Sequence, residues 1–190
     1  MILRKVRTAE WYLRASLALL FARSSSRSRL AAASPRRLLV VCYGNIYRSA
    51  FAGQSLLLQL PPQLEVRSAG FHGVPGRSSP DRHVAMSWMH GVDLTQHRSR
   101  VIGVEDIRWA EIVVLMDRKN WIQLRRMGVP SDALVWLGAF SSGPVEIEDP
   151  YKMGDAAAAR LLDRLDACVR GLAADLKRLL SSQEKGIKTQ

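Results

Sequence analysis

A cysteine and an arginine six positions apart form the part of this sequence best suited to covalent chemistry. Cys42 and Arg48 are separated by five residues, and Ser49 follows directly. A thiolate is a strong nucleophile, and the backbone amides and arginine that bind a phosphate also stabilise a thiolate. A guanidinium can bind two phosphate oxygens at once, which a lysine cannot do. The spacing therefore indicates covalent chemistry on a phosphate group, with Cys42 as the nucleophile and Ser49 assisting the departure of its sulfur.

The residues around this pair predict the elements that position it. Leu38–Val41 is a short apolar run, typical of a strand buried on both faces, and Arg48–Leu60 has the pattern of a helix. A short loop entering a helix directs its N–H groups toward the positive end of the helix dipole, which favours a dianion. Gly44 and Asn45 supply the backbone conformations that such a loop requires. A lone cysteine is usually a small buried residue, but these surroundings favour the catalytic interpretation.

Residues 42–49, CYGNIYRS, resemble the phosphate-binding loop of the low-molecular-weight protein tyrosine phosphatases, whose usual form is C-x-G-N-I-C-R-S. The resemblance runs from about Arg37 to about Leu180 and includes the segments SAG at 68–70 and DPY at 149–151. It implies an enzyme of the bacterial type that hydrolyses phosphotyrosine monoesters through a phosphocysteine intermediate on Cys42. The phosphate-binding loop would then comprise Tyr43, Gly44, Asn45, Ile46, Tyr47, Arg48 and Ser49.

The other chemical element lies in EIEDPYKMGD, residues 146–155. A carboxylate next to proline on a long loop can be held over a neighbouring cleft, although Asp-Pro is also a common turn. The resemblance implies that Asp149 is the general acid, which protonates the leaving phenolate and then deprotonates the water that attacks phosphocysteine.

The resemblance also implies supporting residues around the loop. Ser68 and His97, together with Asn45, would hold the loop in shape; the alternative is that Ser68 forms a turn and His97 lies on the surface. The wall against the substrate ring is expected to include Tyr43, Phe71 and Tyr151, with His72 as the alternative to Phe71.

The loop departs from the family pattern at Tyr47, where the family usually has a second cysteine. In the family that cysteine can form a protective disulfide with the oxidised nucleophile. Oxidised Cys42 would have no local resolving thiol here, so we expect oxidation by peroxide to be less reversible than in relatives.

Strands and helices alternate along the rest of the chain, which has 190 residues and 47% hydrophobic content. The sequence predicts further strands at 64–68, 112–116 and 133–137, and helices at 79–90, 119–127 and 155–180. This order predicts an α/β three-layer sandwich: a four-stranded parallel sheet flanked by helices, with the phosphate-binding loop after the first strand.

Charge divides the chain into parts. Residues 1–37 hold nine Lys or Arg and one acid, so they carry +8 of the net charge of +11 and leave only +3 to the remainder. That remainder is therefore not expected to bind nucleic acid. We expect a basic extension at 1–36, a catalytic domain at 37–182 and a polar tail at 183–190. For the extension, disorder, a targeting signal and a helix on an anionic membrane remain open, with disorder first.

Two cysteines, Cys42 and Cys168, are too few for a disulfide framework and indicate a reducing compartment, so we expect a cytoplasmic protein. Cys168 belongs to the apolar face of the last helix. The four histidines share no ligand spacing with cysteines or acids, and no metal or other cofactor is expected.

The resemblance implies a phosphotyrosine protein as partner, such as a bacterial tyrosine kinase of exopolysaccharide export, and a monomer or weak dimer. Three alternatives remain. An arsenate reductase would need further thiols, a phosphoarginine phosphatase tends to have Thr at the position of Ile46, and a module that only binds phosphotyrosine would not need the intact catalytic residues.

Overall fold

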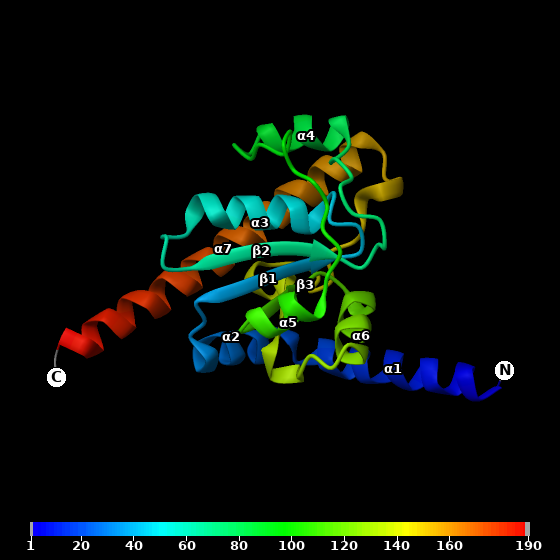
Figure 1. Cartoon of the computed structure of the whole chain (residues 1–190), viewed down its shortest axis with the longest axis horizontal. Coiled ribbons are helices and arrows are strands. Elements are labelled where there is room, and N and C mark those ends of the chain that lie inside the picture. Colours follow the sequence, from blue (N-terminus) through cyan, green and yellow to red (C-terminus); the bar gives the residue numbers. More distant parts are fainter. Residues whose placement is uncertain (1, 189–190) are drawn as a thin grey trace.

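A four-stranded parallel sheet forms the centre of the computed structural model, which describes residues 2–188 (Figure 1). Its strands are β1 (Arg37–Cys42), β2 (Glu65–Gly70), β3 (Ile112–Leu115) and β4 (Leu134–Trp136), in the order β2-β1-β3-β4. The register pairs Cys42 at the end of β1 with Gly70 at the end of β2. All four strands therefore end at one edge, where parallel α/β sheets bind their ligands.

Helices cover both faces of the sheet and complete the predicted three-layer sandwich (Figure 1). On one side lie α3 (Arg48–Gln59), α7 (Asp155–Lys188) and, beyond them, α4 (Asp81–Trp88). On the other lie α2 (Ala22–Ala33), α5 (Val104–Trp109), α6 (Arg118–Arg126) and α1 (Ile2–Leu20). Short 3₁₀ turns occupy Ser131–Ala133, Leu137–Phe140 and Pro150–Lys152. The predicted fold class is confirmed; α1, α2 and α5 were not predicted.

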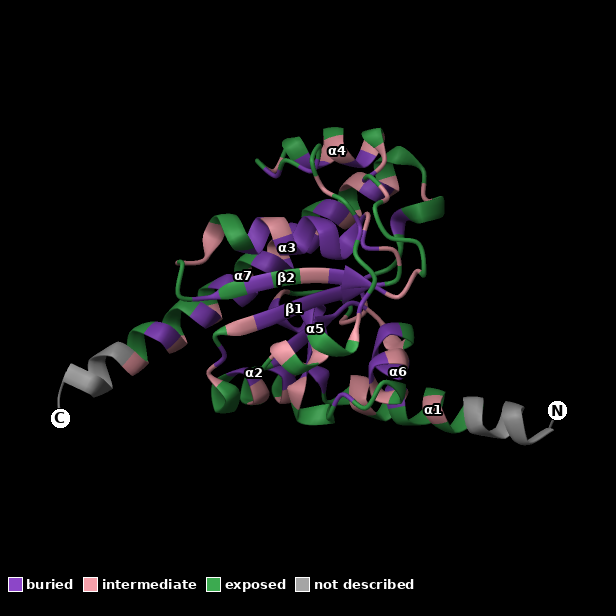
Figure 2. Cartoon of the chain, in the orientation of Figure 1, coloured by how far each residue is buried: buried purple, intermediate pink, exposed green. Residues whose placement is uncertain are grey.

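The core explains why β1 can carry a buried site at its end. The side chains from Leu38 to Val41 are 0% exposed, because helices cover both faces of this inner strand (Figure 2). β3 is equally buried. The apolar strands form a rigid base, and the polar loops that follow them lie at its edge.

The prediction that the basic extension is disordered is wrong for the part of it that the structure describes. Residues 2–33 form α1 and α2, and α2 lies against β4, the edge strand of the sheet. Ser26 and Leu30 of α2 are buried. The Trp136 N–H donates to Ser26 Oγ at 3.1 Å, and Arg29 Nη1 donates to the Leu134 carbonyl at 3.0 Å. α2 thus supplies partners to a strand edge that would otherwise lack them.

The last helix, predicted at 155–180, is longer than expected, because α7 continues through Lys188 into the segment predicted as a polar tail. Ser181 and Ser182 donate their hydroxyls to carbonyls one turn back, at 3.0 and 2.9 Å, so they are accommodated within the helix. Residues 189–190 lie outside the described part. Between residues 2 and 188, no helix combines the length and apolar character needed to cross a membrane.

Candidate active site

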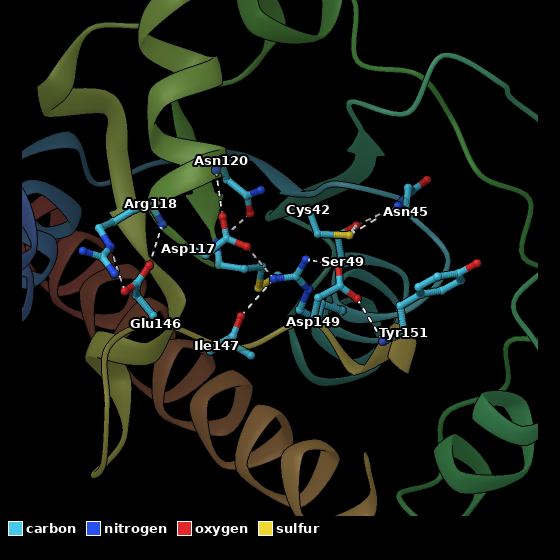
Figure 3. Close-up of polar contacts among 12 residues, drawn as sticks. Cys42, Asn45, Ser49, Asp117, Arg118, Asn120, Glu146, Ile147, Asp149 and Tyr151 are labelled. Atoms are coloured by element: carbon cyan, nitrogen blue, oxygen red, sulfur yellow. Dashed lines mark hydrogen bonds and ion pairs between the residues drawn. The ribbon is translucent and has the colours of Figure 1, made fainter. Parts of the chain in front are cut away.

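The nucleophile candidate Cys42 ends β1 and is 2% exposed. The Asn45 N–H donates to its Sγ at 3.3 Å, and Ser49 Oγ lies 3.0 Å from the same sulfur (Figure 3). The Asn45 side-chain amide donates to Ser49 Oγ at 3.0 Å, which leaves the Ser49 hydroxyl hydrogen free for the sulfur or for the Ala69 carbonyl. Both neighbours of the sulfur can therefore donate to a thiolate.

Asn45 holds the centre of the loop in a left-handed conformation, with φ of 50°, and is 0% exposed. Its Nδ2 donates to Ser68 Oγ at 3.1 Å, and its Oδ1 accepts from the Arg100 N–H at 2.8 Å. His97 Nε2 lies 2.7 Å from the Asn45 carbonyl, which can only accept, so this nitrogen carries the hydrogen. Burial lowers the pKa of His97, which favours the neutral ring. The structure thus places Ser68 and His97 against Asn45.

Gly70 allows the loop to pack against the end of β2. A Cβ atom built on Gly70 would lie 2.8 Å from both the Asn45 nitrogen and the Tyr43 carbonyl oxygen, closer than real Cβ contacts allow. The glycine of the SAG segment is therefore required by this close approach of two backbones.

Arg48 connects the loop to two carboxylates. Its guanidinium is 2% exposed; Nη1 donates to Asp117 Oδ2 at 2.6 Å and to the Ile147 carbonyl at 2.9 Å, while Nη2 donates to Asp149 Oδ2 at 2.6 Å. Burial by itself lowers the pKa of Arg48, but the attraction of Cys42, Asp149 and Asp117 outweighs it, and the net shift is upward. The buried Nε has no hydrogen-bond partner among the described residues.

The two aspartates that bind the Arg48 guanidinium belong to different elements. Asp117 follows β3 and caps α6, accepting from the Asn120 N–H at 2.8 Å (Figure 3). Asp149 caps the 3₁₀ turn at Pro150–Lys152, accepting from the Tyr151 N–H at 3.2 Å, and its side chain is 42% exposed. Asp117 was not predicted as a site residue, although its place after a buried strand is the signal that could have identified it.

Cys42, Arg48 and Asp149 line a common cavity of about 470 Å³. It is lined by Cys42, Tyr43, Gly44, Ile46, Tyr47, Arg48, His72, Arg77, Asp149, Tyr151 and Lys152. The rings of Tyr43 and His72 meet edge to face with centroids 5.8 Å apart, so the wall is partly aromatic. Phe71, expected on this wall, does not line the cavity in the described structure; it packs against the hydrophobic core instead, and the next residue, His72, occupies the wall.

Arg77 and His83 were missed because they contact the loop through its backbone. Arg77 Nη2 donates to the Gly44 carbonyl at 2.5 Å, and His83 Nε2 lies 3.2 Å from the Tyr47 carbonyl. Burial lowers the pKa of His83 to about 4, so the neutral ring donates to that carbonyl. The rings of Tyr47 and His83 lie 4.9 Å apart, and Tyr47 is 9% exposed. At the position of the family's second cysteine, the chain thus packs an aromatic ring against α4.

Comparison with known proteins places this chain in a family. The sequence model of the family described as low molecular weight phosphotyrosine protein phosphatase matches residues 37–182. The chain is 31% identical over 146 residues to the probable low molecular weight protein-tyrosine-phosphatase EpsP of Ralstonia nicotianae, covering 76% of this chain and 96% of that protein. It is 31% identical over 130 residues to Wzb of Escherichia coli, covering 67% of this chain and 88% of Wzb.

Among solved structures, the YwlE arginine phosphatase of Geobacillus stearothermophilus matches with a TM-score of 0.69 and 27% identity, covering 80% of this chain and 97% of that one. The chain belongs to the low-molecular-weight protein tyrosine phosphatase family. It is a phosphatase of this class, a hydrolase, and its substrate is a phosphoprotein. Residues 1–36 lie outside the family match.

Proposed function

We propose that Cys42 is the nucleophile, Arg48 the phosphate-binding cation and Asp149 the general acid and base of this phosphatase. The observation that carries the proposal is the position of Arg48, which joins Asp149 to the loop that holds Cys42 within one cavity. A nucleophile, an anion-binding group and a proton donor facing the same space are what phosphomonoester cleavage requires.

In the first half-reaction, the phosphate dianion binds the loop and the free Nε of Arg48. The dianion competes with Asp149 for Nη2, which releases the Asp149 carboxyl to donate its proton to the leaving oxygen. Cys42 Sγ attacks phosphorus, the bond from phosphorus to the phenolic oxygen breaks, and that oxygen takes the electron pair and the proton of Asp149. The product is phosphocysteine with a free tyrosine.

In the other half-reaction, the Asp149 carboxylate takes a proton from water as the water oxygen attacks phosphorus. The phosphorus–sulfur bond breaks and its electron pair returns to Cys42. Ser49 Oγ, 3.0 Å from the sulfur, donates to the departing thiolate. Phosphate then leaves the cavity.

Trapping the intermediate tests this assignment. Asp149→Ala mixed with p-nitrophenyl phosphate and quenched in acid should carry phosphate on the Cys42 peptide by mass spectrometry, because hydrolysis of phosphocysteine lacks its base. Cys42→Ser, treated in the same way, is the control and should not carry phosphate on a cysteine. Two results with Asp149→Ala would overturn the proposal: phosphate on a residue other than Cys42, or no phosphate at all while the wild type turns over.

Phosphotyrosine is favoured over phosphoarginine as the substrate because part of the cavity wall is aromatic or apolar. Tyr43, Tyr151 and Ile46 line it. The arginine phosphatase among the structural neighbours makes a direct comparison necessary. We expect a higher kcat/KM for a phosphotyrosine peptide than for the same peptide with phosphoarginine; the reverse order would move the chain to the alternative substrate.

A bacterial tyrosine kinase of exopolysaccharide export is the proposed protein partner, on the basis of the family resemblance. Arg77 and Lys152 on the cavity rim suit acidic residues beside the phosphotyrosine. A cytoplasmic location is proposed from the two unpaired cysteines. Dephosphorylation of such a kinase by wild type, compared with Cys42→Ser, tests the partner.

A further inference from the structure

The segment that carries Asp149 is anchored at its start by α2, the second helix of the N-terminal extension. Residues 139–149, here called the acid loop, begin within the 3₁₀ turn at Leu137–Phe140 that follows β4 and lead to the 3₁₀ turn at Pro150–Lys152. Arg23 of α2 donates to the Ala139 carbonyl at 3.3 Å, to the Ser141 carbonyl at 2.5 Å, and to the Gly143 carbonyl. One side chain from the extension therefore binds three backbone acceptors of the first half of the loop.

The distal half of the acid loop is held by a chain of contacts that begins on α1. Arg118 Nη1 donates to Ser16 Oγ of α1 at 3.2 Å. The Arg118 backbone N–H donates to Glu146 Oε1 at 2.9 Å, and its Nε pairs with Glu146 Oε2 at 2.9 Å (Figure 3). The Glu146 side chain is 26% exposed, and its carbonyl accepts from Arg164 at 3.1 Å. Glu146 is thus fixed by both its side chain and its backbone.

These anchors act directly next to the catalytic groups. Ile147, the residue after Glu146, is 0% exposed; its N–H donates to the Met116 carbonyl at 2.9 Å and its carbonyl accepts from Arg48 at 2.9 Å (Figure 3). Asp149 lies two residues further and binds the same guanidinium. A shift of the acid loop would therefore move Asp149 relative to Arg48 and the bound phosphate.

We infer that α1 and α2, which lie outside the family match, position the general acid, with Arg23 and the Arg118–Glu146 pair as the positioning residues. The inference rests on the proposed role of Asp149. A long loop that has little regular structure of its own keeps many conformations, and external anchors reduce them to one in which the proton donor faces the leaving oxygen. The extension is then part of the catalytic apparatus, although its residues do not contact the substrate.

Leaving-group dependence tests this inference, because a general acid matters more for a basic leaving group. The kcat/KM value covers the steps through phosphorus–oxygen cleavage, so phenyl phosphate should depend on Asp149 far more than p-nitrophenyl phosphate. A misplaced catalytic group can cost about 10²-fold, so Arg23→Ala should lower kcat/KM for phenyl phosphate by roughly tenfold or more. With p-nitrophenyl phosphate we expect a change of about twofold at most, because that leaving group needs little protonation.

Arg29→Ala is the matched control. Arg29 is also an arginine of α2 that binds a core carbonyl, but its acceptor, Leu134, belongs to β4 rather than the acid loop. Arg29→Ala should change kcat/KM for the two substrates by the same factor. Ser16→Ala, which removes the contact from α1 to Arg118, should shift the substrate ratio in the same direction as Arg23→Ala and keeps the test of the extension valid if Arg23→Ala does not fold. Glu146→Gln, which removes the ion pair to Arg118, tests the anchor itself and should shift the ratio in the same direction.

An unchanged ratio of the two substrates' kcat/KM values in both Arg23→Ala and Ser16→Ala would overturn the inference, as would the same ratio shift in Arg29→Ala. Asp149→Ala, measured alongside, separates the two levels. If Asp149→Ala leaves the substrate ratio unchanged, the general-acid assignment itself fails, whatever the anchors do. If Asp149→Ala shifts the ratio and the anchor variants do not, only the positioning role is lost.

Discussion

Replacing Asp117 tests how the buried guanidinium is held. Asp117 makes two separate contributions: one carboxylate oxygen binds Arg48 at 2.6 Å, and the other accepts from the Asn120 N–H at 2.8 Å as the N-cap of α6. Its side chain is 19% exposed, so water screens the charge pair only in part. Arg48 keeps Asp149 and the Ile147 carbonyl after the substitution, so the guanidinium does not become an unpaired buried charge.

The expected magnitude follows from these contacts. Losing an N-cap costs about 1 kcal/mol, and losing a hydrogen bond to a charged group costs about 2 kcal/mol. Asp117→Ala should therefore lower the free energy of unfolding by about 3 kcal/mol, or Tm by roughly 6–12 °C for a protein of this size. Asn is also a good N-cap, so Asp117→Asn should lose only the charged bond, about 2 kcal/mol.

Urea unfolding followed by tryptophan fluorescence measures these differences, with unchanged m-values showing that the unfolding transition is comparable. Asp155→Asn is the control, because Asp155 pairs with Arg82 at 2.9 Å but its side chain is 76% exposed. It should change the free energy of unfolding by less than about 0.5 kcal/mol. Equal destabilisation by Asp117→Ala and Asp117→Asn would refute the separation into cap and ion pair, and a loss as small as the control's would refute both.

Two further predictions concern α4 and the loop. Burial lowers the pKa of His83 to about 4, below the ordinary value of 6.5, so the unfolded chain binds more protons between these values. The free energy of unfolding should then be highest above pH 6.5 and fall by roughly 3 kcal/mol as the pH is lowered to 4. In urea titrations across that range, His83→Gln should depend less on pH than wild type. An equal pH dependence in the two proteins would contradict the assignment. For the redox chemistry of Cys42, thiol reductants should restore less activity after peroxide in wild type than in Tyr47→Cys, which regains a resolving thiol; full recovery of the wild type would refute this.

The phosphate-binding loop could be predicted from sequence because its parts are contiguous. The strand, Cys42, Asn45, Arg48 and the helix lie within one short stretch, and local pattern and chemistry agree there. The sheet could also be predicted, because its strands are apolar runs separated by helical patterns. The strand boundaries differed by at most two residues, as at β2, predicted at 64–68 and observed at Glu65–Gly70.

The parts that could not be predicted depend on contacts between distant residues. α2 contains the polar run SSSRSR, and its fit to the core comes from partners such as Trp136, 110 positions away from Ser26. The ion pair of Glu146 with Arg118 could not be predicted, because nothing near Glu146 in the sequence marks Arg118 as its partner. Phe71 and His72 are adjacent, and only the packing of the rim loop decides which of them faces the cavity.

The most direct test of the mechanism is steady-state hydrolysis of phosphotyrosine, with EDTA present and at mildly acidic pH, by wild type, Cys42→Ser and Asp149→Ala. We predict turnover by wild type despite the chelator, no turnover by Cys42→Ser, and a loss of about 10²–10⁴-fold in Asp149→Ala, as for a missing general acid. Near-normal turnover by Cys42→Ser would contradict a phosphocysteine intermediate on this residue. Near-normal turnover by Asp149→Ala would contradict its role as proton donor.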